Sequence, residues 1–410
     1  MISPQKRPIH PLRDGPIMRI KHQHLLLPLA AWIIGVASLL TTVGSSLHAQ
    51  ALETAAKHAI LMDATTGTVL FEKQADEATP PASMGKMMTA YLLFERLKDG
   101  RLSLDDTFAV SDNAWRKGGA RSGGSTMFLQ PRTRVRVEDL VHGMIVASGN
   151  DACVVVAEGL SSSETAFADL MTQRGRELGL ANTVFKNASG LPDPEQMTTV
   201  RDLAILALRT INDFPEFYRY YSEKTFTYNG IRQGNRNPLI YQNNGVDGLK
   251  TGHIEEAGYG LAASMKRGDR RLILVVNGLD SIKARGSESD RLIEWGMREF
   301  GNYALFKSGE RIADADVWLG EAKTVPLVIR NDVVVTLPKK ARRDMKVTVT
   351  YSGPVPAPVA AGAQLAKVVV TAPGIEPREI PLYADGGVER LGLVGRLRSA
   401  FSSILWGTSS

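Results

Sequence analysis

The spacing of apolar residues changes once along this chain, near residue 303, and that change limits the folds available to it. Before this point, apolar runs of strand length alternate with stretches whose apolar residues recur at helical spacing. After it, short β-rich runs alternate with Pro, Gly and charged turns. The pattern predicts an α/β (α+β) sandwich, rather than a parallel doubly wound sheet, followed by a small all-β sandwich domain of about eighty residues.

The same spacing places the individual elements. A hairpin is expected at 58–71, because two apolar runs flank a Gly-containing loop there. Helices are expected at 84–98, 137–146, 151–159, 164–178, 201–212 and 287–300, and strands at 258–265 and 272–278. The strands of the second domain are expected at 317–319, 325–329, 333–337, 345–351, 365–371 and 380–383.

Composition and charge exclude several classes of protein. The chain is 43% hydrophobic and 22% charged, which excludes a disordered, collagen-like or polytopic membrane protein. A single cysteine, Cys153, excludes an intramolecular disulfide framework and a zinc ribbon. Residues 1–51 carry five basic residues and one acid, a balance of +4 within the total of +6. Because the positive charge belongs mostly to the N-terminus, no nucleic-acid partner is expected.

The N-terminal segment, residues 1–51, has the organisation of a secretory signal peptide. Basic residues precede Leu25–Leu40, a run of sixteen uncharged residues that is short for a membrane span, and small residues follow it up to Ala51. We predict cleavage after Ala51; the alternative is an N-terminal anchor that is not cleaved. Met18 is an alternative start of the chain. The mature chain is then expected to act outside the cytoplasm.

The C-terminal segment has the pattern of an amphipathic helix. Between Val388 and Trp406, apolar residues recur at helical spacing, while Arg390, Arg396 and Arg398 lie elsewhere on the helical wheel. A basic amphipathic helix with an aromatic end suits the plane of an anionic membrane surface. Amphipathicity alone is equally compatible with a terminal helix packed on its own protein.

The first chemical motif is a Ser-x-x-Lys at Ser83 and Lys86, where a loop enters the predicted helix. One helical turn separates the two side chains, so the amine can lie within hydrogen-bond reach of the hydroxyl. A lysine whose charge is disfavoured by burial and by another cation can accept the proton of the serine and make it a nucleophile. The motif is weak alone, since one or two such matches are expected by chance in ~400 residues.

Two further motifs are weak individually. Ser148-Gly149-Asn150 lies between two predicted helices. The Ser148 hydroxyl can relay a proton, and the Asn150 amide can hold a substrate amide. A plain turn with Asn150 as N-cap explains this motif equally.

Lys250-Thr251-Gly252 precedes the predicted strand at 258–265. A cation and a hydroxyl at a strand edge can hold a carboxylate while glycine admits a substrate backbone, and the alternative is an ordinary turn.

Taken together, the three motifs are specific. Ser-x-x-Lys, Ser-x-Asn and Lys-Thr-Gly are the signature of penicillin-binding proteins and class A β-lactamases. The sequence resembles this serine penicillin-recognising superfamily, and most closely the low-molecular-mass penicillin-binding proteins that are D-alanyl-D-alanine carboxypeptidases. The resemblance covers residues 52–407 and includes the stretches at 81–84, 187–191, 221–224, 246–253 and 285–289.

The resemblance implies four regions and a role for each site residue. The regions are a signal peptide (1–51), a β-lactamase/transpeptidase-like catalytic domain (52–303), a small β-rich domain (304–386) and an amphipathic membrane-surface anchor (387–410). The implied catalytic residues are the nucleophile Ser83, its base Lys86 and the proton shuttle Ser148. The implied substrate-binding residues are Asn150, Lys250, Thr251, Gly252, His253 and Arg285, with backbone N–H groups of Ser83 and His253 forming the oxyanion hole. Without the resemblance, Arg285 would be interpreted as a solvated surface arginine.

The implied reaction is hydrolysis of the terminal D-Ala–D-Ala bond of peptidoglycan pentapeptide stems through an acyl-enzyme. β-Lactams are then expected as covalent inhibitors, and the location is the periplasm, with the C-terminal helix attached to the outer face of the inner membrane. No metal or organic cofactor is implied, because lysine and backbone donors supply the electrostatics. Cys153 is expected to be a small buried hydrophobe, and Gly149 a harmless departure from the usual motif.

Three alternatives remain at this stage. A β-lactamase would need a carboxylate for deacylation, usually in Glu-x-x-Leu-Asn, and the candidate from Glu177 to Asn182 is one residue too long. A peptidoglycan endopeptidase would use the same acyl chemistry on a different bond. A non-enzymatic wall-binding scaffold is disfavoured, because Ser83, Lys86 and Lys250 are all intact.

Overall fold

The structure is a computed structural model that describes residues 18–20 and 52–395. The chain divides between Arg298 and Glu299 into two compact units. The sequence placed this boundary near residue 303. The observed boundary is a few residues earlier because β11 (Phe300–Phe306) pairs with β14 (Val333–Pro338) of the second unit. Most of the expected signal peptide and of the C-terminal helix lies outside the described residues. Within those residues, no helix is long and apolar enough to cross a bilayer.

A five-stranded antiparallel sheet forms the centre of the first unit, in the order β3-β2-β10-β9-β8. Its strands are β2 (His58–Asp63), β3 (Val69–Lys73), β8 (Val246–Ile254), β9 (Gly258–Arg267) and β10 (Arg270–Leu279). The hairpin predicted at 58–71 is therefore present, and β8 lies at one edge of the sheet. The sandwich predicted from the sequence is confirmed, with an antiparallel rather than a parallel sheet.

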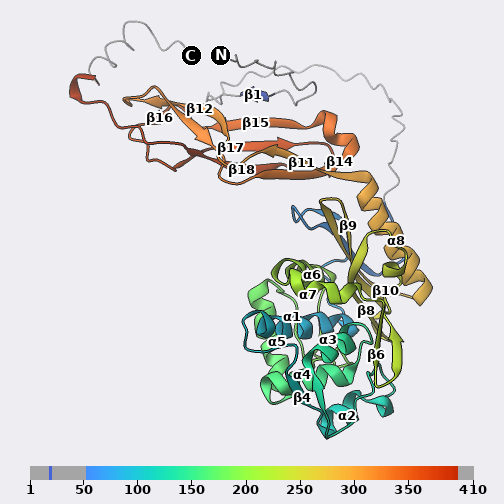
Figure 1. Cartoon of the computed structure of the whole chain (residues 1–410). Helices are drawn as coiled ribbons and strands as arrows, with labels where there is room; N and C mark the ends of the chain where they lie inside the picture. The colour runs from blue at the N-terminus through green and yellow to red at the C-terminus, as the bar shows by residue number, and fades with distance from the viewer. Residues whose placement is uncertain (1–17, 21–51, 396–410) are drawn as a thin grey trace, which may run out of the picture. The chain divides into compact units, whose positions relative to one another are not determined.

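Helices cover both faces of this sheet, and the alternation of side chains along β10 shows how. Ile273 and Val275 belong to the larger core, which they share with the helices of one layer. Leu272 and Leu274 point to the opposite face, where they share a smaller core with Leu292 of α8. Because successive side chains of a strand alternate between faces, covering both faces buries the strand almost completely. Figure 1 shows α8 next to β10.

The helices of the first unit are close to the predicted ones: α1 (Lys86–Lys98), α3 (Val137–Ile145), α4 (Asn150–Ser161), α5 (Glu164–Leu178), α6 (Val200–Asp213) and α8 (Ile282–Glu299). Helix α8 begins before the predicted residue 287, so that Arg285 lies inside it. The sequence missed α2 (Asp112–Gly118), which buries only Ala114 and Gly118 and so has little apolar periodicity. Shorter elements are β4 (Thr107–Ala109), β5 (Arg134–Arg136), α7 (Pro215–Tyr218), β6 (Thr225–Tyr228) and β7 (Ile231–Gly234).

The second unit is all-β, as predicted. Its seven-stranded sheet has the order β1-β15-β17-β18-β13-β12-β16. The strands are β1 (Met18–Ile20), β12 (Arg311–Trp318), β13 (Thr324–Val328), β15 (Lys346–Tyr351), β16 (Val355–Pro356), β17 (Gln364–Thr371) and β18 (Arg378–Ala384). A two-stranded ribbon of β11 and β14 shares one core with this sheet, and alternate residues such as Leu337, Val349 and Val368 fill that core.

Candidate active site

Ser83 lies in a one-turn 3-10 helix, η1 (Ala82–Gly85), that leads directly into α1. The amide of Met84 donates to the carbonyl of Pro81 (3.1 Å), and this bond closes the turn. Lys86 is the first residue of α1 and is buried, with only 1% of its surface exposed. The junction of the two helices places the amine of Lys86 2.9 Å from Ser83 Oγ.

The amine of Lys86 has three polar partners. Besides Ser83 Oγ it contacts Asn150 Oδ1 at 2.8 Å and the backbone carbonyl of Ser189 at 2.5 Å. The last two atoms can only accept hydrogen bonds, whereas a hydroxyl can also donate one. A protonated amine would donate to all three, including Ser83 Oγ, whereas a neutral amine donates to Asn150 and Ser189 and offers its lone pair to the Ser83 O–H. This is the arrangement that a general base for Ser83 requires.

The surroundings of Lys86 favour the neutral amine. The pKa of Lys86 is lowered from 10.5 to about 8, mainly by burial; Cys153 and Asp151 oppose this shift, and the nearby cation Arg236 adds to it. Within residues 52–395, no carboxylate forms an ion pair with Lys86. A base whose pKa lies near the working pH is present in its neutral form often enough to act.

The second motif lies between α3 and α4. Ser148 is buried, has φ +58°, and its Oγ has no hydrogen-bond partner in the described part of the chain. Asn150 is the first residue of α4 and directs its Oδ1 to Lys86, so it is not the N-cap that a plain turn would need. A Cβ on Gly149 would lie 2.8 Å from Asp151 Oδ1 and 3.0 Å from the amide of Met127. Glycine is therefore the residue that fits this crowded turn.

The third motif lies inside a strand of its own, which agrees with the strand-edge interpretation and not with the ordinary turn that was its alternative. Lys250, Thr251 and Gly252 are buried residues of β8, the edge strand. A Cβ on Gly252 would lie only 3.1 Å from Ala82 Cβ, so glycine allows β8 to lie close against η1. An edge strand keeps one row of backbone groups unpaired, and β8 also lies against the turn that carries Ser83.

Four basic side chains, those of Lys86, Lys250, Arg236 and Arg285, converge beside this strand. Lys250 is 3% exposed, and its amine donates to the carbonyl of Thr251 at 3.1 Å. Burial and repulsion from Lys86 and Arg236 hold the pKa of Lys250 well below its usual value. Arg285, also buried, donates from Nη2 to the carbonyl of Arg236 (3.2 Å). None of these four side chains forms an ion pair with a carboxylate among the described residues. They are therefore available to bind an anion.

A cavity of about 430 Å³ is lined by one residue from each of the first two motifs and by His253, which directly follows the third motif. Ser83, Asn150 and His253 line it, together with Arg236 and the loop at 189–191. The side chain of His253 is exposed and stacks on Tyr259, with 3.9 Å between ring centroids. No carboxylate is among the described residues that line this cavity. Glu177, the candidate deacylation residue of a β-lactamase, is instead paired with Arg174 at 2.6 Å.

Sequence reasoning did not assign Asn187, Ser189 or Arg236 to the site. Asn187 Oδ1 accepts from the amides of Gly190 (2.8 Å) and Leu191 (3.1 Å), and this shapes the loop that presents the Ser189 carbonyl to Lys86. An Asn two residues before Ser-Gly is a turn signal that points to such a loop. Arg236 donates to Ser125 Oγ across the cavity rim, and no local pattern distinguishes it from other surface arginines.

Cys153 lies one turn past Asn150 and is fully buried. Burial raises the pKa of its thiol from 9.0 to about 12, although Lys86 opposes the shift. The thiolate is the nucleophilic form of cysteine, and it is rare at such a pKa. Cys153 is therefore a small buried side chain, as the sequence predicted.

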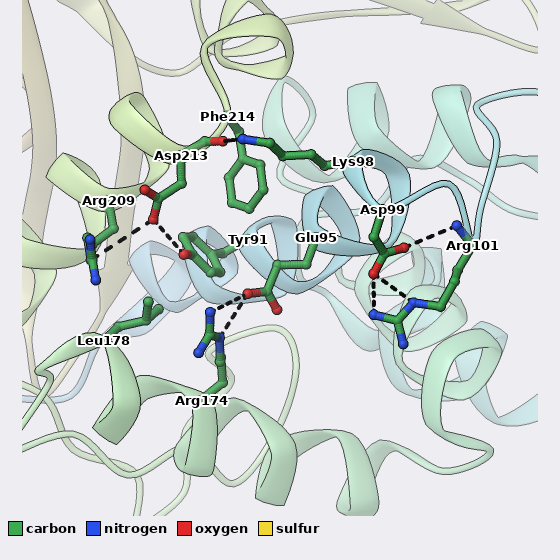
Figure 2. Close-up of a pocket in the computed structure, with 10 residues that line it drawn as sticks. All are labelled: Tyr91, Glu95, Lys98, Asp99, Arg101, Arg174, Leu178, Arg209, Asp213 and Phe214. Carbon is green, nitrogen blue, oxygen red and sulfur yellow. Dashed lines mark hydrogen bonds and ion pairs between the residues drawn. The ribbon is translucent and has the colours of Figure 1, made fainter.

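A larger hollow of about 690 Å³ lies elsewhere in the first unit, at the C-terminal ends of α1 and α6 (Figure 2). Its charged side chains are engaged with one another. Arg174 pairs with Glu95 at 2.8 Å, and Tyr91 donates to Asp213 at 2.7 Å. Because these partners satisfy one another, we assign this hollow no chemistry.

Comparison with known proteins agrees with this geometry. Residues 45–281 match the family model described as D-alanyl-D-alanine carboxypeptidase, and residues 300–390 match the model of the penicillin-binding protein 5 C-terminal domain. The chain belongs to the D-alanyl-D-alanine carboxypeptidase family. As a member of it, the chain is a serine-type carboxypeptidase, as the resemblance implied.

Relatives with both units are similar along most of their length. The D-alanyl-D-alanine carboxypeptidase DacC of Escherichia coli is 39% identical over 341 residues, which are 82% of this chain and 85% of DacC. The crystal structure of penicillin-binding protein 5 from Haemophilus influenzae superposes with a TM-score of 0.75 at 36% identity, covering 83% of this chain and 99% of that one. Penicillin-binding protein 6B of Escherichia coli gives a TM-score of 0.69 at 34% identity, covering 83% of this chain and 98% of that one.

Proposed function

We propose that Ser83 is the nucleophile of this carboxypeptidase and that Lys86 is the base that activates it. The observation that carries the proposal is the hydrogen-bond set of Lys86. Two partners, Asn150 Oδ1 and the Ser189 carbonyl, take up its N–H groups and leave the lone pair for the Ser83 O–H. The lowered pKa of Lys86, about 8, makes that lone pair available at moderately alkaline pH.

The reaction follows from these positions. Ser83 Oγ attacks the carbonyl carbon of the penultimate D-alanine while its proton moves to Lys86 Nζ. The developing oxyanion would accept hydrogen bonds from the backbone N–H groups of Ser83 and His253, which both line the cavity. The C–N bond then breaks, and the departing amine of D-alanine takes a proton through Ser148. Water finally hydrolyses the ester on Ser83 and frees the shortened peptide.

The cations on the sheet side of the cleft select the substrate. A terminal carboxylate entering beside β8 would meet Lys250 and Thr251, with Arg236 and Arg285 behind them. Gly252 leaves room for the substrate backbone along the edge strand. The substrate class that fits is a peptide ending in D-Ala–D-Ala, here the pentapeptide stem of peptidoglycan.

The same acylation would trap a β-lactam. The structure of penicillin-binding protein D2 from Listeria monocytogenes in the ampicillin-bound form has a TM-score of 0.54 at 29% identity, covering 60% of this chain and 99% of that one. A β-lactam carries a carboxylate beside its reactive carbonyl, so it suits both the nucleophile and the cation cluster. No cavity-lining carboxylate among the described residues is placed to activate a deacylating water, which argues against a β-lactamase.

The location of the enzyme is a further part of the proposal. Residues 1–51 would direct export to the periplasm, and residues 387–410 would attach the enzyme to the outer face of the inner membrane. The support is the sequence pattern: a basic and apolar leader at one end, and a basic amphipathic segment ending in Trp406 at the other.

One experiment tests the nucleophile and the scissile bond together. The mature chain is incubated with a muramyl pentapeptide, and the products are identified by mass spectrometry. Release of D-alanine by the wild type, with loss of both D-alanine release and fluorescent-penicillin labelling in Ser83→Ala, is the expected result. Labelling retained in Ser83→Ala would place the nucleophile elsewhere. Cleavage only of cross-linked dimers would show an endopeptidase.

A further inference from the structure

Among the described residues, the second unit exposes one large aromatic side chain, that of Trp318. Trp318 is the last residue of β12 and is 57% exposed. Along this strand Ala315 and Val317 face the core, whereas Asp314, Asp316 and Trp318 alternate onto the other side. The pleat therefore directs the indole away from the core, on the side of two carboxylates.

The last described residues of the chain are fastened beside this tryptophan. The amide of Leu391 donates to the carbonyl of Leu319 at 2.9 Å, and Arg390 forms a β-bridge with Gly320. A Cβ on Gly320 would lie 2.8 Å from Val388 Cγ1, so glycine allows this close contact. The segment at 388–391 is therefore held against the turn that follows Trp318.

Two more exposed apolar side chains follow at once. Leu393 is 73% exposed and Val394 is 81% exposed. Six large hydrophobic side chains are exposed in the described part of the chain, and Trp318, Leu393 and Val394 are three of them. Scattered single exposures are ordinary, whereas apolar side chains gathered on one surface mark a binding site. Leu393 and Val394 follow closely after Leu391, which is bonded to the residue next to Trp318.

We propose that Trp318, with Arg390, Leu393 and Val394, forms a membrane-contact surface of the second unit. The proposal rests on the proposed attachment of residues 387–410 and adds a second contact from the folded domain. The chain continues from this surface as residues 395–410, which contain two arginines and no acid, so the tail would meet anionic lipid. Asp314 and Asp316 lie on the Trp318 side of β12, so the contribution of Trp318 to binding is apolar and not electrostatic. An indole suits such an interface, because its ring is apolar while its N–H keeps a polar partner.

The location of the surface has a consequence for anchoring. A helix attached through a flexible segment would leave the domain free to rotate above the lipid. The bond from Leu391 to Leu319 and the bridge at Gly320 instead join the start of the anchor to the turn that follows β12. Insertion of Trp318 beside the anchor would then fix how the β domain stands on the membrane.

Vesicle binding of the full mature chain tests this surface. The probe is sedimentation with vesicles of phosphatidylethanolamine and phosphatidylglycerol. Trp318→Ser is expected to weaken partitioning roughly three- to tenfold, because an interfacial aromatic contributes binding of that order. Trp318→Tyr should keep partitioning within about twofold of wild type, since an amphipathic ring remains. The matched control Ile282→Ser, which removes an apolar side chain 61% exposed in the other unit, should leave it unchanged.

A second measurement reports the depth of Trp318 directly. In Trp406→Phe, vesicles with brominated acyl chains should quench part of the tryptophan fluorescence. This quenching should disappear when Trp318→Phe is added. Absence of that quenching, together with wild-type partitioning of Trp318→Ser, would overturn the surface. If truncation after Gly387 still abolishes binding, the anchor itself would stand.

Other occupants of the surface give distinct results. A second copy of the chain would produce a concentration-dependent dimer that Trp318→Ser abolishes, and this would overturn the membrane assignment. A tail folded back on Trp318 would make the indole more accessible to acrylamide after truncation, without vesicles, and would also overturn it. Failure of the full chain to bind vesicles would overturn the proposed anchor and the surface together.

Discussion

The two buried lysines of the cleft differ in what surrounds them rather than in how deeply they lie. Lys86, on the helical side, is 1% exposed and contacts Ser83, Asn150 and Ser189. Lys250, on the sheet side, is 3% exposed, and within the described part of the chain its amine donates one hydrogen bond, to the carbonyl of Thr251. The protein thus satisfies the first amine and leaves the second for the substrate. The first is suited to proton transfer and the second to anion binding.

The largest effect should come from the helical side. Lys86→Met removes the amine and keeps an unbranched side chain in the core, so acylation of Ser83 by a penicillin should slow by roughly 10³–10⁴-fold. Stopped-flow acylation with mass-spectrometric detection of the adduct measures this. Thermal unfolding of the same variant serves as the control for folding. An acylation rate within tenfold of wild type would remove Lys86 from its role as base.

The next effect separates the sheet side from the helical side. Lys250→Met should lower kcat/KM for the pentapeptide by roughly 10²–10³, because a buried charge partner of the substrate carboxylate is lost. Hydrolysis of a peptide with an amidated C-terminus is the comparison, since it offers no carboxylate. Wild type and Lys250→Met should turn over the amide equally. An equal loss on both substrates would mean that Lys250 acts on the reaction and not on the carboxylate.

The lowered pKa of Lys250 predicts proton uptake when a carboxylate binds. Above its depressed pKa the amine is neutral in the free enzyme, and an entering anion raises that pKa again, so the amine takes up at most about one proton. Calorimetry with Ser83→Ala and an uncleaved pentapeptide, at about pH 9 in two buffers of different ionisation enthalpy, measures the uptake. The observed enthalpy should depend on the buffer. Identical enthalpies in both buffers would show that Lys250 is already charged.

A smaller effect is expected where the two sides meet. Gly252→Ala places a methyl group 3.1 Å from Ala82 Cβ and must push β8 away from η1, so acylation should slow by about tenfold. Gly175→Ala is the matched control, because its Cβ would meet Leu180 at an ordinary 3.4 Å in a helix. The control should acylate at the wild-type rate. If Gly252→Ala did so too, the close fit of strand and turn would not govern the site.

The sequence predicted the elements with strong periodicity and missed features that depend on tertiary contact. Helix α5 was placed at its observed bounds, because its apolar residues recur regularly. The motif lysines were found from the pattern, but the pattern could not show that β8 is an edge strand lying against η1. Arg236 was missed since nothing nearby in the sequence marks it, and only the fold brings it beside Lys250. The boundary near residue 303 moved because β11 pairs with a strand further along the chain.

The pH dependence of Ser83 acylation tests the central claim most directly. It is measured with a penicillin on the Lys250→Met background, so that the second lysine does not titrate. Below its pKa, Lys86 is protonated and cannot accept the serine proton, so the rate should rise with pH and level off with a midpoint near 8. A rate that is flat between about pH 6 and 9, or that rises only near the ordinary lysine value of about 10.4, would contradict a neutral Lys86 as the base.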